Sequence, residues 1–115
     1  MRFSFRNRNN WDYRRAISKN RADKVIELIQ LGNDLESVDK DGLRPLHMAV
    51  LSDQSVIVKL ILAAGADVEA GGPRGFTALH LAASTSAVLS VNALIESGAN
   101  MEAIGPNGET PLFLA

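Results

Sequence analysis

Cysteine is absent from the 115 residues of this chain, and aromatic residues make up only 5% of it. Without cysteine there is no disulfide framework and no thiolate metal site, so a reducing compartment is permitted. The shortage of aromatic residues, against a hydrophobic content of 46%, favours thin helical layers over a bulky core. No apolar run approaches the roughly 18 residues that a transmembrane helix needs. We therefore expect one small domain without a transmembrane segment, placed in the cytoplasm, with the nucleus also open.

The net charge of −1 conceals an uneven distribution. Residues 1–24 hold eight Lys or Arg against two Asp, a balance of +6, and residues 25–115 hold four against eleven, a balance of −7. This predicts a basic N-terminal end and an acidic body. Residues 1–9 lack the apolar stretch of a secretory signal. They are interpreted as a flexible basic arm, and a mitochondrial-type presequence stays open because no acid precedes Asp12.

Three glycines, Gly32, Gly65 and Gly98, are spaced 33 residues apart, and each closes a short apolar run. Aligning residues 39–70 with 72–103 gives nine identities in 32 columns. A fixed period of this length indicates a repeat architecture. The same interval links three further sets of residues: Gly42, Gly75 and Gly108; Leu46, Leu79 and Leu112; and Ala16, Ala49, Ala82 and Ala115.

Within each period the apolar spacing predicts two helices, and the closing glycine can end the second one in a left-handed conformation. The predicted helices cover residues 11–19, 25–31, 45–52, 55–63, a segment within 75–83, and 88–97. The predicted divisions are an arm (1–9) and a repeat domain (10–115), the latter made of a degenerate N-terminal cap repeat (10–38), two repeats (39–71 and 72–104) and a truncated repeat (105–115).

Three stretches of the sequence carry recognisable motifs: Gly65-Ala-Asp-Val-Glu-Ala70, Gly75-Phe-Thr-Ala-Leu-His-Leu-Ala-Ala83 and Gly108-Glu-Thr-Pro-Leu112. These motifs resemble those of the ankyrin repeat family. The resemblance implies an all-α solenoid of stacked helix–turn–helix units, with projecting turn or β-hairpin fingers. It also implies a non-enzymatic module, often part of a scaffold, that binds other proteins.

The chain departs from the family pattern at several positions. The usual Gly-His pair between the helices is replaced by Asp53-Gln54 and by Ser86-Ala87. Because Asp tolerates the left-handed conformation better than Ser, the second of these turns is expected to be looser. Arg44 stands where Thr usually holds the following box. Gly72 and Gly105 stand where Asp usually braces the finger, so their fingers are expected to be more mobile than residues 39–42.

The sequence contains no arrangement of residues that indicates catalysis. His47 and His80 occupy equivalent positions, and the resemblance makes them structural, each hydrogen-bonded to backbone in the adjoining turn. A metal site would need further ligands at their level. Asp39 and Asp41 are interpreted as turn formers. There is no Cys nucleophile, no Gly-x-Ser-x-Gly and no phosphate-binding loop, so no catalytic, cofactor or metal site is predicted.

By resemblance, a partner protein binds the finger tips and the exposed face of the first helices. Leu43 and Phe76 are equivalent positions expected to be exposed, and Arg74 and Phe76 are predicted to anchor the partner with Leu43 beside them. The predicted partner-binding residues are Lys40, Asp41, Leu43, Leu51, Ser52, Pro73, Arg74, Phe76, Ser84, Thr85, Pro106, Asn107 and Glu109.

Two alternatives stay open beside this interaction module. The chain could be a recognition appendage of a larger protein with a catalytic or effector domain downstream. The basic N-terminus could contact nucleic acid or an anionic membrane surface, although a solvated cap explains the same charges. Pro111 to Ala115 begin a helix without a covering second one, so self-association or fraying at this end is expected.

Overall fold

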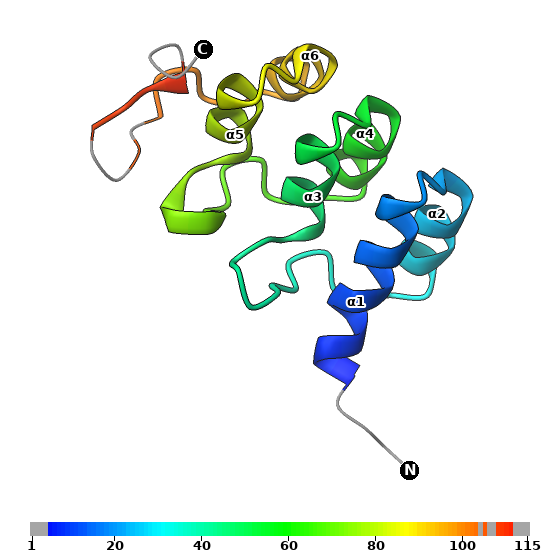
Figure 1. Ribbon diagram of the computed structural model, residues 1–115. Coiled ribbons are helices and arrows are strands. Elements are labelled where there is room, and N and C mark those ends of the chain that lie inside the picture. The colour runs from blue at the N-terminus through cyan, green and yellow to red at the C-terminus, as the bar shows by residue number, and fades with distance from the viewer. Residues whose placement is uncertain (1–4, 104, 106–107, 112–115) are drawn as a thin grey trace.

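Three helix pairs are stacked side by side along the chain (Figure 1). The protein is seen here as a computed structural model that describes residues 5–103, 105 and 108–111, with side chains from residue 12 onward. The pairs are α1 (Phe5–Ser18) with α2 (Ala22–Gln30), α3 (Pro45–Leu51) with α4 (Ser55–Ala63), and α5 (Ala78–Ser84) with α6 (Val88–Glu96). The all-α stack of helix–turn–helix units predicted from the sequence is confirmed.

The helices follow the predicted boundaries closely in the second and third units, where α4 spans the predicted residues 55–63. The first helix differs, because α1 begins at Phe5 instead of residue 11. It therefore includes residues 5–9, which the sequence analysis assigned to a flexible arm. Residues 1–4 of that arm lie outside the described part of the chain.

Glycines end the second helix of each pair, as the 33-residue spacing predicted. Gly32, Gly65 and Gly98 have φ of 82°, 103° and 90°. In each case the next residue donates its N–H back to a carbonyl five residues earlier, as Asn33 does to Leu28 at 3.1 Å. This is the hydrogen-bond pattern of a helix C-cap whose following residue is left-handed, a conformation that glycine adopts without a Cβ penalty.

The turn between the two helices of each pair also contains a left-handed residue, here without glycine. Asn20, Asp53 and Ser86 have φ of 54°, 50° and 59°. The turn at Ser86, expected to be looser than the turn at Asp53, has the same backbone conformation. The difference lies in the side chains, because Asp53 reaches the next repeat and accepts a hydrogen bond there.

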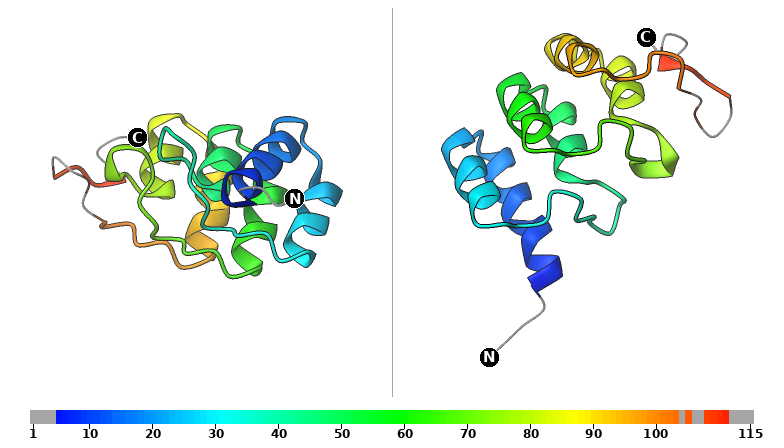
Figure 2. Two further views of the ribbon diagram at one scale, coloured as in Figure 1. Left: turned by 90° about the horizontal axis from the view of Figure 1, so that it is seen from below. Right: turned by 180° about the vertical axis from the view of Figure 1, so that it is seen from behind.

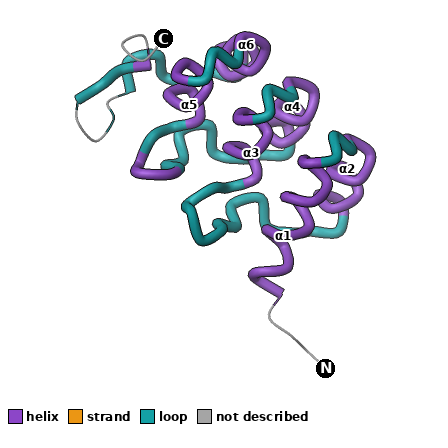
Figure 3. Tube along the Cα trace, viewed as in Figure 1, coloured by secondary structure: helices purple, strands orange, loops and turns teal. Residues whose placement is uncertain are grey.

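The helices form two rows. The first helices α1, α3 and α5 pack on one another in order, and α4 packs on α2 and α6 in the second row. The loops that lead into α3 and α5 project beyond the first row, on the side away from the second (Figures 1 and 2). These loops are the predicted fingers. They are turns, since the described residues contain no strand and only one 3₁₀ helix, η1 (Pro73–Gly75), in the second finger (Figure 3).

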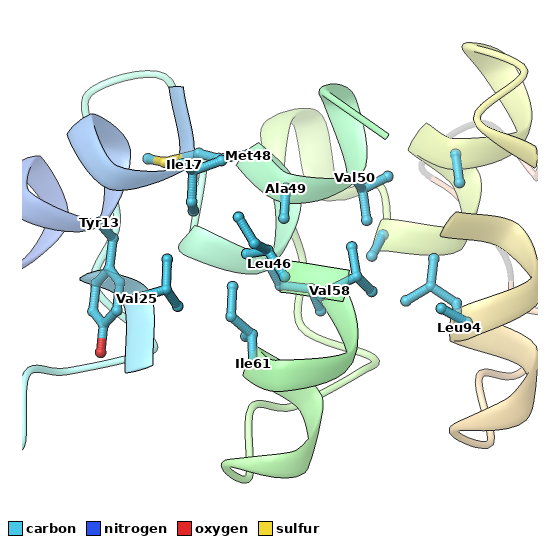
Figure 4. Packing of buried hydrophobic residues seen from close by; sticks show 14 of the residues in the cluster. Tyr13, Ile17, Val25, Leu46, Met48, Ala49, Val50, Val58, Ile61 and Leu94 are labelled. Carbon is cyan, nitrogen blue, oxygen red and sulfur yellow. The ribbon is translucent and has the colours of Figure 1, made fainter. Parts of the chain in front are cut away.

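The core is a band of side chains that runs through the stack between the rows (Figure 4). Tyr13, Leu46 and Leu79 occupy equivalent positions and are 0%, 2% and 4% exposed. Ala49 and Ala82 are fully buried, so the first helices pack closely. Each repeat alone would leave these apolar faces in water, and stacking removes them from it.

Hydrogen bonds between successive repeats fix their register. Glu36 accepts the backbone N–H of Asp67 at 2.9 Å, and its equivalent Glu69 accepts that of Asn100 at 2.6 Å. A carboxylate that accepts a backbone N–H makes a charge-assisted bond, which is stronger than a neutral one. The constant 33-residue interval of the sequence therefore places the same contact at both junctions between repeats.

Candidate functional site

The candidate site comprises the fingers and the row of first helices, α1, α3 and α5, and is called here the finger face. The same backbone hydrogen bond closes each of the three fingers. Asp39 donates its N–H to Leu43 O at 3.0 Å, Gly72 to Phe76 O at 2.7 Å, and Gly105 to Glu109 O at 2.7 Å. Pro106 and Asn107, two predicted contact residues at the third tip, lie outside the described residues.

The first finger is braced by Asp39. One oxygen of its carboxylate accepts the N–H groups of Asp41 at 2.8 Å and Leu43 at 2.9 Å. The other oxygen accepts from the Arg14 guanidinium at 2.9 Å, although Arg14 is 25 residues away in α1. The side chains of Lys40 and Asp41 remain exposed at the tip.

The second finger lacks this brace, because Gly72 has no side chain. A Cβ on Gly72 would lie 2.9 Å from two ring atoms of His47. Glycine is therefore required here for the close approach of the His47 ring. Whether this finger is more mobile than the first stays a prediction.

Arg74 occupies the tip of the second finger in an unusual backbone conformation. Its φ and ψ are 60° and 18°, and Gly75 follows with φ of 81°. Left-handed backbone is uncommon for a residue with a long side chain. Arg74 is exposed, and it belongs to no ion pair between the described residues.

Phe76 and Leu43 are not the fully exposed residues that the sequence analysis expected. Both are half-buried. The Phe76 ring lies 5.5 Å from the His80 ring, centroid to centroid, tilted by 58°, and it also lies against Gly105, where a Cβ would meet it at 3.0 Å. Leu43 packs against the core. Each side chain therefore offers a partner only part of its surface.

The C-terminal ends of α3 and α5 complete the finger face. Leu51 is 43% exposed, and Ser52 beside it is exposed. At the equivalent positions of the next repeat, Ser84 and Thr85 donate their hydroxyl protons to Leu81 O at 3.0 Å and 2.8 Å. Since those protons are already used, the two hydroxyls can offer a partner their oxygens as acceptors.

His47 and His80 are fully buried beneath the fingers and hydrogen-bond the backbone of the adjoining turn, as the resemblance implied. Nδ1 of His47 accepts the Arg44 N–H at 3.1 Å, so its proton lies on Nε2, which donates to Ala70 O at 3.2 Å. Nδ1 of His80 accepts the Thr77 N–H at 3.2 Å, and Nε2 donates to Glu109 O at 3.1 Å. Each imidazole therefore joins the start of a helix to the next finger.

Burial shifts the titration of two groups in this region. Desolvation lowers the pKa of His47, the nearby Arg44 guanidinium lowers it further, and the bond to Ala70 opposes them. Burial, aided by the charge of Asp34, raises the pKa of Tyr13 to about 12. The Tyr13 hydroxyl donates to Asn33 O at 2.9 Å. Both groups are neutral at physiological pH and act as structural hydrogen-bonding partners.

A groove of about 620 Å³ lies at the C-terminal end of the stack, against α5 and α6. Its lining is mostly apolar and includes Leu79, Val91, Ile95, Met101 and Pro111. The sequence predicted an apolar surface at this end from residues 111–115. The groove extends over α6 to Met101, which is 56% exposed. Nothing in the sequence indicated this exposure, because Met101 stands 33 residues after Val68, at an ordinary apolar position of the repeat.

The described residues include no group of three or more His, Asp or Glu arranged to hold a metal ion. None of the helices in the described part of the chain is long and apolar enough to cross a membrane.

A family model for ankyrin repeats, in three copies, matches residues 14–105 of the chain. The match covers most of the sequence, from within α1 to the end of α6 and beyond, so the protein belongs to the ankyrin repeat family. Members of this family are generally protein–protein interaction modules. No curated protein matched the chain when its sequence was compared with theirs.

Proposed function

We propose that this protein is a non-enzymatic module that binds another protein through the finger face. The observation that carries the proposal is Arg74, a long cationic side chain presented by left-handed backbone at an exposed finger tip. A non-glycine residue in this conformation costs on the order of 1 kcal/mol or more. Glycine would avoid that cost, so the side chain itself is the feature to be explained.

The other described non-glycine residues with positive φ have a structural explanation, because Asn20, Asp53 and Ser86 each close the turn inside a helix pair. Arg74 closes no helix pair. The equivalent residue of the first finger, Asp41, does not have positive φ. The conformation of Arg74 therefore differs from that of its equivalent in the first finger.

Phe76 adjoins Arg74 and supports it as an anchor. The ring is held on one side by His80 and Gly105, which restricts its motion before a partner arrives. A rigid, partly exposed aromatic side chain beside an arginine has the composition typical of interface hot spots. Leu43, half-buried in the first finger, adds apolar surface at the equivalent position.

The test is the affinity of binders selected from a peptide display library against the folded chain. Arg74→Ala and Phe76→Ala are each expected to weaken binding by about 30-fold, which corresponds to the ~2 kcal/mol of a hot-spot truncation. Lys59→Ala is the matched control, because Lys59 is exposed on α4 in the second row. Affinities of the Arg74 and Phe76 variants within about twofold of the parent would contradict the proposal.

The alternative function, an appendage whose basic N-terminus contacts an anionic surface, has less support. Among the described cations of this segment, Arg14 is in an ion pair with Asp39, Arg21 with Asp23, and Lys24 with Glu27. These acids reduce the charge that a phosphate backbone or an anionic membrane would meet. A solvated cap repeat explains the paired charges directly.

A further inference from the structure

The cations that lack an acidic partner are unevenly placed. Beyond residue 11, where side chains are described, Lys19, Lys40, Lys59 and Arg74 belong to no ion pair. All four are exposed. Lys40 and Arg74 are at the tips of the first and second fingers, and only Lys59 lies in the second row of helices.

Lys19 extends the same face onto the first repeat. It directly follows α1 and stands 33 residues before Ser52 and 66 before Thr85, the positions at the ends of α3 and α5 that belong to the finger face. Since α1 packs on α3 in the first row, Lys19 and Ser52 are equivalent points on adjacent helices. The first repeat therefore contributes to the face as well as capping the stack.

Most of the acidic body lies elsewhere. Five acids lie between the second helices and the finger turns, ahead of residues 39–43 and 72–76 and of Gly105: Asp34, Glu36, Asp67, Glu69 and Glu102. Glu36 and Glu69 bond the next repeat there. Among the described residues of the finger face the exposed acid is Asp41, while Asp12 on α1 and Glu109 in the third finger are half-buried and Asp39 is paired with Arg14. The N-terminal half of the face is therefore positive on a protein whose net charge is −1.

The same face also carries apolar surface. Leu51, at the end of α3, is 43% exposed, and Leu43 and Phe76 are half-buried in the two fingers. A face that combines separated cations with apolar side chains is complementary to an acidic polypeptide that also carries large apolar residues. A single-stranded nucleic acid typically stacks its bases on exposed aromatic side chains. Among the described side chains of this face, Tyr13 is fully buried and Phe76 is held against His80.

From this arrangement we propose that the partner is an acidic protein segment with interspersed apolar side chains, seated on the finger face and contacting Lys19, Lys40 and Arg74 around Leu51. The inference rests on the proposed function and deepens it by naming the chemistry of the partner. It adds the first repeat, through Lys19, to the binding surface.

The experiment measures fluorescence anisotropy of three labelled probes with the full chain at about 150 mM salt, where long-range charge effects are screened. The probes are a peptide of alternating glutamate and leucine, the same peptide with glutamine in place of glutamate, and single-stranded oligothymidine. We expect saturable binding of the glutamate peptide, and at least about tenfold weaker binding of the other two.

Charge reversals locate the site. Lys19→Glu and Lys40→Glu are each expected to weaken binding of the glutamate peptide about fivefold, as the loss of an ion pair worth up to ~1 kcal/mol implies. Lys59→Glu makes the same change of charge on α4 and should alter affinity less than about twofold. Coincident urea unfolding curves establish that each variant is folded, and Lys19→Gln and Lys40→Gln replace any variant that is not.

Equal loss in Lys59→Glu, equal binding of the glutamine peptide, or tighter binding of oligothymidine would each overturn the inference. Different results would contradict the proposed function and the acidic partner. If library-selected binders depend on Arg74 and Phe76 but are not acidic and tolerate Lys19→Glu, the function stands and the acidic partner is wrong. If those binders ignore Arg74 and Phe76, the proposed function itself is wrong.

Discussion

At the scale of single residues, His47 links stability to pH. The buried ring is neutral, and burial holds its pKa below the ordinary 6.5. The unfolded chain therefore binds more protons than the folded one between the lowered pKa and 6.5. In that window the free energy of unfolding falls as the pH falls, and the loss is complete below the folded pKa. Above about pH 7 the contribution of His47 is fully present.

The prediction is tested with His47→Gln by urea unfolding at about pH 7.5 and about pH 5.5. Glutamine cannot reproduce both backbone bonds of His47, so the variant should be less stable by about 1–3 kcal/mol at the higher pH. It should lose less stability than the parent on acidification. Equal losses of stability in parent and variant would show that His47 is not the linked group.

The substitution Gly72→Ala tests whether the close approach of the His47 ring requires a glycine at position 72. The added Cβ would lie 2.9 Å from the His47 ring, and we expect a destabilisation of about 1–3 kcal/mol through this overpacking. Gly71→Ala is the matched control, because its Cβ would meet nothing closer than 3.8 Å and its φ is not positive. Thermal unfolding of both variants provides the comparison, and equal effects would refute the steric explanation.

The resemblance to the ankyrin repeat predicted the structural roles of His47 and His80, whose positions recur at the repeat interval. It did not predict the burial of Phe76. That burial depends on Gly105 and His80, which belong to different repeats, and no local pattern reports such a contact. The Arg14–Asp39 pair was missed for the same reason, because its partners are 25 residues apart and the sequence analysis assigned Arg14 only to a basic surface.

At the scale of the helices, Asp53 joins two repeats. Its φ of 50° closes the turn before α4, and its carboxylate accepts the Ser90 N–H in the first turn of α6 at 2.9 Å. Ser90 is fully buried, so its N–H has no access to water. The carboxylate of one repeat therefore caps the helix of the next.

Asp53→Ala removes the acceptor and also places alanine in left-handed backbone, so a loss of about 1–2 kcal/mol is expected. Asp53→Asn keeps an acceptor oxygen and tolerates the backbone, and should cost less than half as much. Amide exchange localises the effect, because Ser90 and the start of α6 should lose protection in Asp53→Ala. A loss of protection spread evenly over α3 and α4 instead would contradict the capping role.

Helix boundaries were predictable where apolar periodicity and a closing glycine coincide, as in α4 and α6. The start of α1 was not, because residues 5–9 are rich in Arg and Asn and show no apolar period. Finger geometry was partly predictable. The glycine at the end of each finger turn indicated where that turn lies in the sequence. The left-handed backbone of Arg74 could not be predicted, because arginine has no preference for that conformation.

At the scale of the whole molecule, the repeat stack has two unlike ends. The second helix of the first repeat carries Asp23, Lys24 and Glu27, in two ion pairs with residues of the same repeat. At the other end, the groove of about 620 Å³ is mostly apolar. An apolar surface of this kind favours association, which agrees with the self-association expected from the sequence.

We therefore predict that the mean mass of this 115-residue chain in sedimentation rises with its concentration. Ile95→Glu should suppress the rise, because Ile95 lines the groove and is 41% exposed. The control is Ile26→Glu on α2, where Ile26 is 39% exposed and distant in the stack from the groove. A monomer at all concentrations, or an equal effect of both variants, would show that the groove does not mediate association.

The central claim is that one face of this ankyrin repeat protein, made of fingers and first helices, binds a partner protein. The most direct measurement is the amide-exchange footprint of the chain in complex with a library-selected binder. We expect added protection at the fingers, residues 39–43 and 72–76, and at the C-terminal ends of α1 and α3, with α2, α4 and α6 unchanged. Protection confined to α2, α4 and α6, with the fingers exchanging as in the free chain, would contradict it.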